Sequence, residues 1–330
     1  MMSRLILVLL LASRAFAFEW TSLLIQPGVA RSFAMGNATS AMFGSLSEGS
    51  ANPAGFIAFP KATRTGVTAV VQGSGFLSIA DYLDQVKDTR STVSQVGDVA
   101  SLFVRSISAK HRWATASAIL AEPVMRRDET TRFDNSPSKH ALSEYQTSVL
   151  LNLLLHPRVR VGGRVDFYSH GFKGDGEGFS YGVILKPRGM QVGLHYQRFP
   201  VTGPRWLHPL DRRVDQGTTA SVAIQRPEYT LAFQLSNLSE SDLLGFLEPR
   251  VGAEWRPWRA VALRAGGSLF TRSRGAAATA GVGLLDANWF RHHDNRLEVP
   301  EDVLSAAMGI LYDAGRPVQG FTTMTLAWRF

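Results

Sequence analysis

The chain has 330 residues, of which 45% are apolar and 19% are charged, and it contains no cysteine. This apolar share is too high for a disordered chain, and the lack of cysteine excludes disulfide scaffolds, cysteine-ligated metal sites and thiol catalysis. The 35 lysine and arginine residues outnumber the 27 aspartate and glutamate residues, and the resulting net charge of +8 predicts anionic surroundings.

Residues 1–17 have the pattern of a secretory signal peptide. Arg4 supplies the positive start, Leu5 to Ala12 form the apolar stretch, and Ala15-Phe16-Ala17 is a cleavage site, so we expect the mature chain to begin at Phe18. Export argues against nucleic acid as a partner. No later apolar run reaches the roughly 20 residues of a transmembrane helix. A membrane location would therefore require a closed β-barrel, in which every backbone amide is paired.

Residues 18–60 form the second predicted unit, a hatch or plug. They are rich in glycine, alanine and serine, which allow backbones to pack closely in a confined space. Asn52 is a plausible helix N-cap, with Pro53 at the first helical position. A disordered periplasmic tail is the alternative, but apolar residues such as Phe33, Met42 and Phe56 argue against it.

Residues 61–330 alternate between apolar and polar side chains. Val165 and Phe167 fall on one face of a strand, for example, and Arg164 and Asp166 fall on the other. A soluble sandwich with one wet face also shows this alternation. The runs are about ten residues long, however, which matches a tilted transmembrane strand, whereas soluble strands average about five or six. The pattern predicts an all-β, antiparallel up-and-down barrel with its apolar faces toward lipid.

Fourteen strands are predicted, an even number that places both termini in the periplasm of an outer-membrane barrel. In chain order they cover residues 62–73, 98–108, 111–122, 142–154, 158–169, 177–186, 189–198, 215–226, 228–236, 248–256, 259–270, 276–286, 303–312 and 320–330. Short connections at Pro157, Pro187, Pro227 and Pro257 alternate with longer polar loops. Short turns on one rim and long loops on the other are typical of bacterial outer-membrane barrels.

The last predicted strand alternates and ends in Phe330. It resembles the C-terminal signal that the barrel-assembly machinery reads, so this machinery is an expected partner.

The hatch also carries the sequence G-V-A-R-S-F-A-M-G-N-A from Gly28 to Ala38, followed by N-P-A-G from Asn52 to Gly55. This pair of motifs resembles the N-terminus of the PorV/PorQ group within the FadL-like outer-membrane barrel superfamily. The resemblance implies fourteen strands and an N-terminal hatch inside the lumen. FadL members carry hydrophobic compounds such as long-chain fatty acids, and PorV-type members receive secreted cargo beside the type IX translocon. The hatch residues that follow from the motifs are Arg31, Met35, Gly36, Asn52, Pro53, Ala54 and Gly55.

Charged residues are predicted at positions that face the lumen. They are Glu144, Arg160, Arg164, Asp166, Arg250, Glu254 and Arg264. One interpretation is a basic constriction that selects anions. We favour the other, a network of arginines and carboxylates that packs the lumen and docks the hatch, because buried charges are normally paired.

The functional hypothesis is passage of a hydrophobic or small solute, gated by the hatch. The alternative is a PorV-type secretion accessory that binds secreted proteins at the cell surface. A lipid-modifying barrel enzyme is a remote third possibility, for which His140 with Ser143 or His170 with Asp175 could be nominated. These pairs are not convergent triads, and His292-His293 lacks metal-ligand spacing to a further ligand. We therefore expect no enzyme activity, metal or cofactor.

Basic residues in the external loops predict contact with lipopolysaccharide phosphates, although solvated loop charge is an equal alternative. They are Arg126, Arg127, Arg132, Lys139, Arg205, Arg212, Arg213, Arg272 and Arg274.

Overall fold

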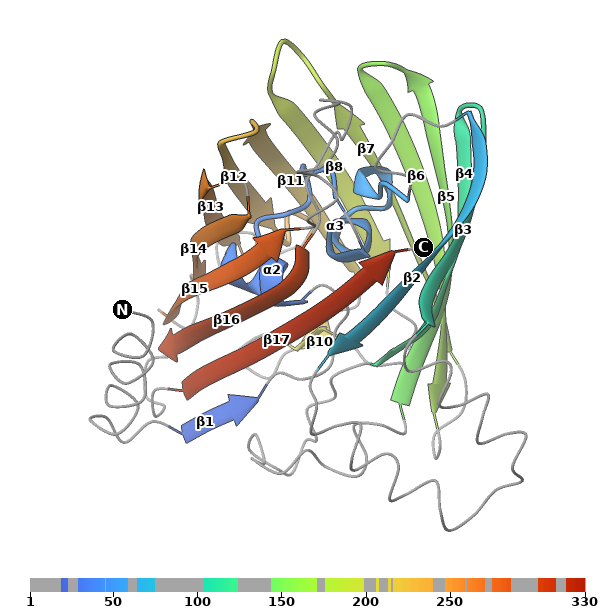
Figure 1. Cartoon of the computed structure of the whole chain (residues 1–330). Coiled ribbons are helices and arrows are strands. Elements are labelled where there is room, and N and C mark those ends of the chain that lie inside the picture. Colours follow the sequence, from blue (N-terminus) through green and yellow to red (C-terminus); the bar gives the residue numbers. More distant parts are fainter. Residues whose placement is uncertain are drawn as a thin grey trace.

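A computed structural model gives the arrangement of most of the chain (Figure 1). It describes residues 19–22, 29–44, 46–58, 64–74, 104–123, 144–170, 176–198, 206–207, 213–214, 216–239, 247–258, 260–270, 275–285, 302–312 and 319–329. The predicted signal peptide and most of the predicted external loops lie outside these ranges.

Fourteen antiparallel strands form an up-and-down barrel, and this prediction is confirmed. The strands are β2 (Thr65–Ser74), β3 (Val104–His111), β4 (Ala114–Pro123), β5 (Glu144–His156), β6 (Val159–His170), β7 (Gly176–Leu185), β8 (Gln191–Arg198), β11 (Gln216–Gln225), β12 (Tyr229–Ser236), β13 (Glu248–Trp258), β14 (Val261–Phe270), β15 (Gly275–Leu285), β16 (Asp302–Tyr312) and β17 (Gln319–Arg329). Each strand pairs with the next, and β17 pairs with β2 to close the ring.

At the closing seam, β17 pairs with two different strands along the two halves of its length. Its second half pairs with β2, from Thr325 opposite Ser74 to Arg329 opposite Val70. Its first half instead pairs in parallel with β1 (Glu19–Ser22), which lies beside it in Figure 1. A separate two-stranded antiparallel sheet is formed by β9 (Trp206–Leu207) and β10 (Arg213–Val214).

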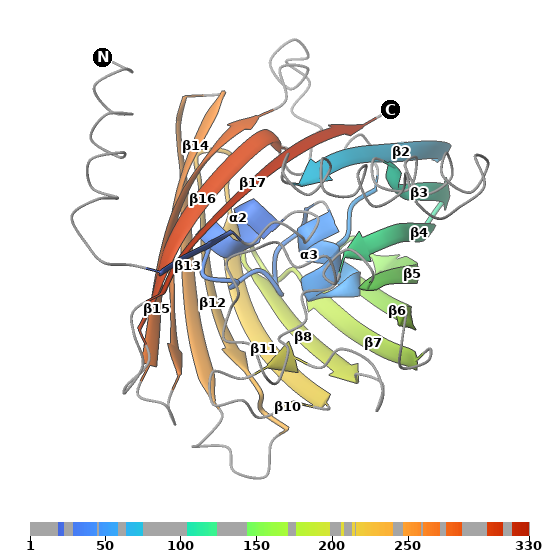
Figure 2. The same cartoon turned by 90° about the horizontal axis from the view of Figure 1, so that it is seen from below.

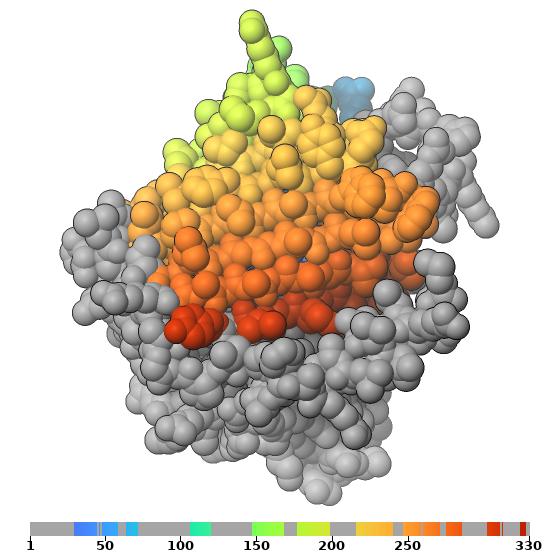
Figure 3. Space-filling model, turned by 90° about the vertical axis from the view of Figure 1, so that its left-hand side faces the viewer, coloured from blue at the N-terminus to red at the C-terminus, as the bar shows by residue number. Residues whose placement is uncertain are grey.

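Two faces of the wall differ in chemistry, as the alternation predicts. Apolar side chains point outward, with Val149, Val165 and Phe233 each more than 40% exposed. Their neighbours in sequence, such as Ser148, Arg164 and Gln234, are buried on the inner face. Figure 3 shows the outer side of β11 to β16 as a continuous surface of side chains.

Two predicted boundaries are wrong. The turn after the second strand lies at Arg112–Trp113 rather than near residue 109, because Arg112 adopts a positive φ of 52° that closes the hairpin. Pro257 was expected in a turn, but it lies within β13, at an irregularity in the pairing with β14 between Trp255 and Trp258. Proline has no backbone N–H to donate, so it is tolerated where a ladder is interrupted.

A compact piece lies inside the ring of strands (Figure 2). We call residues 29–44 and 46–58 the plug. It contains α2 (Val29–Ala34), α3 (Leu46–Ala51) and a short 3-10 helix, η1 (Pro53–Gly55). Its apolar side chains pack with inward residues of the wall, with Met42 and Ala223 in one cluster and Phe56 and Leu150 in another. Among the described residues, no helix has the length and apolar character needed to cross a bilayer.

Candidate functional site

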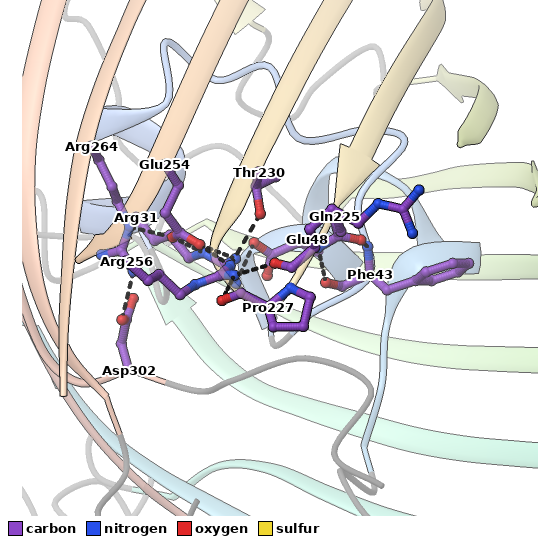
Figure 4. A network of polar contacts seen from close by, with 11 residues as sticks. Arg31, Phe43, Glu48, Gln225, Pro227, Thr230, Glu254, Arg256, Arg264 and Asp302 are labelled. Carbon is purple, nitrogen blue, oxygen red and sulfur yellow. Dashed lines mark hydrogen bonds and ion pairs between the residues drawn. The ribbon is translucent and has the colours of Figure 1, made fainter. Parts of the chain in front are cut away.

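The contact between plug and wall is the candidate site, because the plug lies within the ring of strands and charged side chains from both meet there. Its centre is Glu254 on β13, which is buried with its side chain fully enclosed. Arg31 of α2 donates to Glu254 Oε2 from Nε at 3.1 Å, and Arg264 of β14 donates to the same oxygen from Nε at 2.6 Å. Arg256 donates to the other carboxylate oxygen (Figure 4). One wall carboxylate therefore joins one plug arginine to two wall arginines.

Two further carboxylates balance the charge of this cluster. Glu48 of α3 lies 3.2 Å from Arg31 Nη1, and Asp302 at the start of β16 lies 2.6 Å from Arg264 Nη2. We call Arg31, Glu48, Glu254, Arg256, Arg264 and Asp302 the ionic cluster. Burial alone would lower the pKa of Arg31, but Glu254 and then Glu48 raise it above its usual value. The plug arginine is therefore held in its charged form.

Neutral hydrogen bonds fix the end of α2. The chain reverses at Gly36 and Asn37, which have positive φ angles of 61° and 58°. This leaves carbonyl groups without helical partners. Thr279 of β15 donates to the Ala34 carbonyl at 3.2 Å, and Ser268 of β14 donates to the Gly36 carbonyl at 3.0 Å. Hydroxyl groups of the wall thus complete the plug's own backbone bonding.

Asn52 caps η1, as predicted from the Asn-Pro sequence. Its side-chain oxygen accepts from the Ala54 amide at 3.0 Å, and its Nδ2 donates to the Ser40 carbonyl at 2.8 Å. From the wall, Asn152 Nδ2 lies within 3.0 Å of both the Pro53 and Ala54 carbonyl oxygens. An asparagine of β5 therefore contacts this turn directly.

A third set of contacts holds Phe43, which lies in the chain between α2 and η1. The side-chain amide of Gln225 accepts from the Phe43 amide at 2.8 Å and donates to the Phe43 carbonyl at 2.9 Å. Arg160 and Lys186 lie over the Phe43 ring, with charge-to-centroid distances of 5.0 and 5.8 Å. Phe43 is thus bound through its backbone and both of these cations.

Glycines on the inner wall let the plug backbone approach the strands. A Cβ added at Gly162 would lie 2.6 Å from the Pro53 carbonyl oxygen, and one at Gly266 would lie 2.8 Å from Gly36 Cα. Real Cβ atoms essentially never come so close to backbone. The glycines occur in register, with Gly162 opposite Gly182 and Gly252 opposite Gly266. Two paired glycine sites therefore mark where the plug lies flat against the wall.

The remaining predicted lumen residues form local pairs. Arg164 Nε lies 2.8 Å from Asp166 Oδ1, and Arg164 also donates to the Ser50 carbonyl of the plug at 3.3 Å. Arg250 pairs with Glu248 of its own strand at 2.6 Å. Glu144 begins β5 opposite His170, at the rim of long loops. Met35, predicted from the hatch motif, is fully buried beside Ala232.

Several residues of the site are absent from the sequence predictions. They are Glu48, Asn152, Gln225, Arg256 and Asp302. The predicted strand ends at Arg256, so this residue is not among the predicted lumen residues. It nevertheless shares the even-numbered face of β13 with Glu254. For Asn152 the available signal was its polar side chain within the apolar run Val149 to Leu155.

The chemistry of the described residues offers no metal centre, since no group of three or more histidine, aspartate and glutamate side chains gathers among them. His140, Ser143 and Asp175 lie outside the described residues, as do the external-loop arginines apart from Arg213 at the start of β10. His170 closes β6.

No protein-family model matches the sequence, and no curated protein matches it. Among solved structures, the chain is similar to two engineered mutants of the porin of Rhodopseudomonas blastica. The first has 8% sequence identity and a TM-score of 0.38, and the second has 8% identity and a TM-score of 0.37. Each comparison covers 68% of this chain and 76% of the porin chain.

Proposed function

We propose that this protein is an integral outer-membrane barrel of FadL-like type, in which the plug controls passage of a hydrophobic or small solute. The supporting observation is that, among the described residues, side chains such as Arg31, Asn152 and Gln225 bind the plug to the wall, whereas the only strand ladder from the predicted hatch is the short one of β1 with β17. Bonds of this kind can be exchanged one group at a time without opening the barrel, because the strand pairing does not depend on them.

The outward apolar face supports the membrane location. Apolar side chains along successive strands face away from the plug, and aromatic residues such as Trp113, Tyr229 and Trp258 are exposed near the short turns. Outer-membrane barrels have an apolar band bordered by aromatic residues. In this orientation the short turns, the start of β2 and the end of β17 lie on the periplasmic side.

A reversible tether between plug and wall tests the gating role. Ala34 of α2 and Ala307 of β16 pack in one cluster, and the protein has no native cysteine. The double variant Ala34→Cys/Ala307→Cys can therefore be locked by oxidation and released by reduction. We expect the reduced form in proteoliposomes to admit a small sugar or a long-chain fatty acid, and the oxidised form to admit neither.

The single variant Ala34→Cys is the matched control, and its activity should not depend on oxidation. Equal uptake by the oxidised and reduced double variant would show that the solute does not need movement of the plug.

A secretion scaffold of PorV type is the second candidate. It is favoured by the spread of the anchors, which hold the plug to β5 through Asn152, to β11 through Gln225 and to β14 through Ser268. A plug held on several sides suits a static support for surface-bound proteins. Affinity purification from solubilised outer membranes tests this. A translocon subunit in the purified material would support the scaffold, and a bound fatty acid would support transport.

A further inference from the structure

The rim of short turns carries a concentration of positive charge that lies outside the ionic cluster. Four exposed cations occupy three neighbouring turns: Arg158 between β5 and β6, Lys186 and Arg188 between β7 and β8, and Arg226 between β11 and β12. We call these four residues the basic turn cluster. The one exposed carboxylate in these three turns is Glu228.

The three turns are in contact with one another. The Lys186 amide donates to the Arg158 carbonyl at 2.8 Å, which joins the first turn to the second. The Arg226 guanidinium lies over Gly189, because a Cβ added there would be 2.7 Å from Arg226 Nη2. The four cations therefore form one patch rather than three separate charges.

The same patch continues along the rim. The Arg112 amide donates to the Arg64 carbonyl at 2.6 Å, so the turn between β3 and β4 lies beside the residue that precedes β2. Arg64 and Arg112 are both exposed. Charge of one sign on adjacent turns is costly in isolation, because like charges repel, and it indicates an anionic layer at this level.

Aromatic side chains on the outer wall indicate where along the strands such an anionic layer would lie. Trp113, Trp255 and Trp258 are 56%, 58% and 66% exposed, and Tyr229 lies opposite Trp255 in the ladder. Trp113 lies in the short turn between β3 and β4, Tyr229 begins β12, and Trp255 and Trp258 lie in the last part of β13, next to a short turn. Tryptophan and tyrosine favour the head-group level of a bilayer. The basic turn cluster lies next to these aromatic side chains in the barrel wall.

On the lumen side of the patch, groups of the protein already contact the nearby cations. Phe43 of the plug lies beneath Arg160 and Lys186, and Arg256 is committed to Glu254 and to the Arg226 and Pro227 carbonyls. An anionic ligand therefore has access from the membrane side of the rim. A lipid head group approaches from that side, whereas a solute crossing the lumen does not.

We propose that the short-turn rim binds the head groups of anionic phospholipids in the leaflet that it meets, through the basic turn cluster. Arginine suits this role because its guanidinium donates two parallel hydrogen bonds to a phosphate. The site does not depend on the proposed transport function.

The test compares boundary lipids around the whole protein in vesicles. Spin-labelled phosphatidylglycerol and phosphatidylcholine are the probes, and the quantity measured is the ratio of their association constants. We expect the native protein to prefer phosphatidylglycerol, with a contribution of up to roughly five-fold from each cation at low salt. The preference should fall as ionic strength rises, because salt screens exposed charges.

The triple variant Arg158→Gln/Arg188→Gln/Arg226→Gln should lower the ratio strongly, although Lys186 of the cluster stays in place. Arg198→Gln is the matched control, because Arg198 is also exposed but ends β8 at the opposite rim. It should keep most of the preference. Heat-dependent mobility on gels reports whether each variant forms the barrel, and the charge-preserving variant Arg158→Lys/Arg188→Lys/Arg226→Lys should restore the preference.

Three results would overturn the proposal. One is equal association of both lipids with the native protein, and another is an unchanged preference in the triple variant. The third is loss of the preference on adding millimolar inorganic phosphate at constant ionic strength, which would identify a site for soluble anions. Salt-dependent binding of an acidic peptide without any lipid preference would instead assign the patch to an acidic protein.

Discussion

The inner and outer faces of this barrel are made by alternate residues of the same strands, yet they obey different requirements. On the inner face of β6, Gly162 accommodates the Pro53 backbone and Arg164 binds both Asp166 and the plug. On the outer face, Val165 and Phe167 share only their apolar character and exposure. The inner face is therefore specific at each position, whereas the outer face needs only a general property.

The largest expected effect comes from the centre of the ionic cluster. Glu254→Gln removes the negative charge from a site where three arginines meet, and unpaired buried charges are costly. We expect a loss of about 3–5 kcal/mol in the free energy of unfolding, measured by urea titration in phospholipid vesicles. Glu228→Gln, at an exposed turn, is the control and should change it by less than about 0.5 kcal/mol. A small effect of Glu254→Gln would mean that water or other groups replace the carboxylate.

The outer face should respond to charge but not to shape. Phe233 lies in the middle of β12 and is 43% exposed. Phe233→Arg should cost about 2–4 kcal/mol of folding free energy in vesicles if this face contacts the bilayer core. Phe233→Leu, which keeps an apolar side chain, is the control and should cost much less. Equal stability of both variants would argue against lipid at this position.

Two adjacent glycines on β6 give the sharpest comparison of the faces. A Cβ at Gly162 would meet the plug backbone, whereas one at Gly163 would have the Ser180 carbonyl at 4.0 Å as its nearest neighbour. Gly162→Ala should therefore cost about 1–3 kcal/mol through overpacking and make the plug more sensitive to protease. Gly163→Ala should be neutral or slightly stabilising. Equal protease sensitivity of the two variants would contradict the close approach seen at Gly162.

A smaller effect is expected at the cap of η1. Asn52→Ala removes the bond to the Ala54 amide, and loss of a helix cap costs about 0.5–2 kcal/mol. Hydrogen exchange of the Ala54 amide is the direct measurement, and it should become faster. Asn52→Asp keeps an acceptor for this amide and should preserve its protection. Unchanged exchange in the alanine variant would show that the turn is held by the wall alone.

Parts of the site were predictable where they follow from local pattern. The period of two placed Arg164, Glu254 and Arg264 on the inner face, and Asn-Pro identified the cap of η1. The partners were not predictable, since Arg31 and Glu254 are 223 positions apart in the chain. The position of Gly162 between Arg160 and Arg164 on the polar face is a local signal for a close approach of backbone at this point.

The sequence by itself determined which residues face inward and which face outward, because that choice depends on strand periodicity and on the difference between water-like and lipid-like surroundings. It also determined the number of strands. Only the tertiary structure decided which wall strand contacts which part of the plug and how one carboxylate joins three arginines. It also decided which short turns lie close enough for their cations to form one patch. These outcomes depend on the curvature and register of the closed barrel, which bring together residues that no local pattern links.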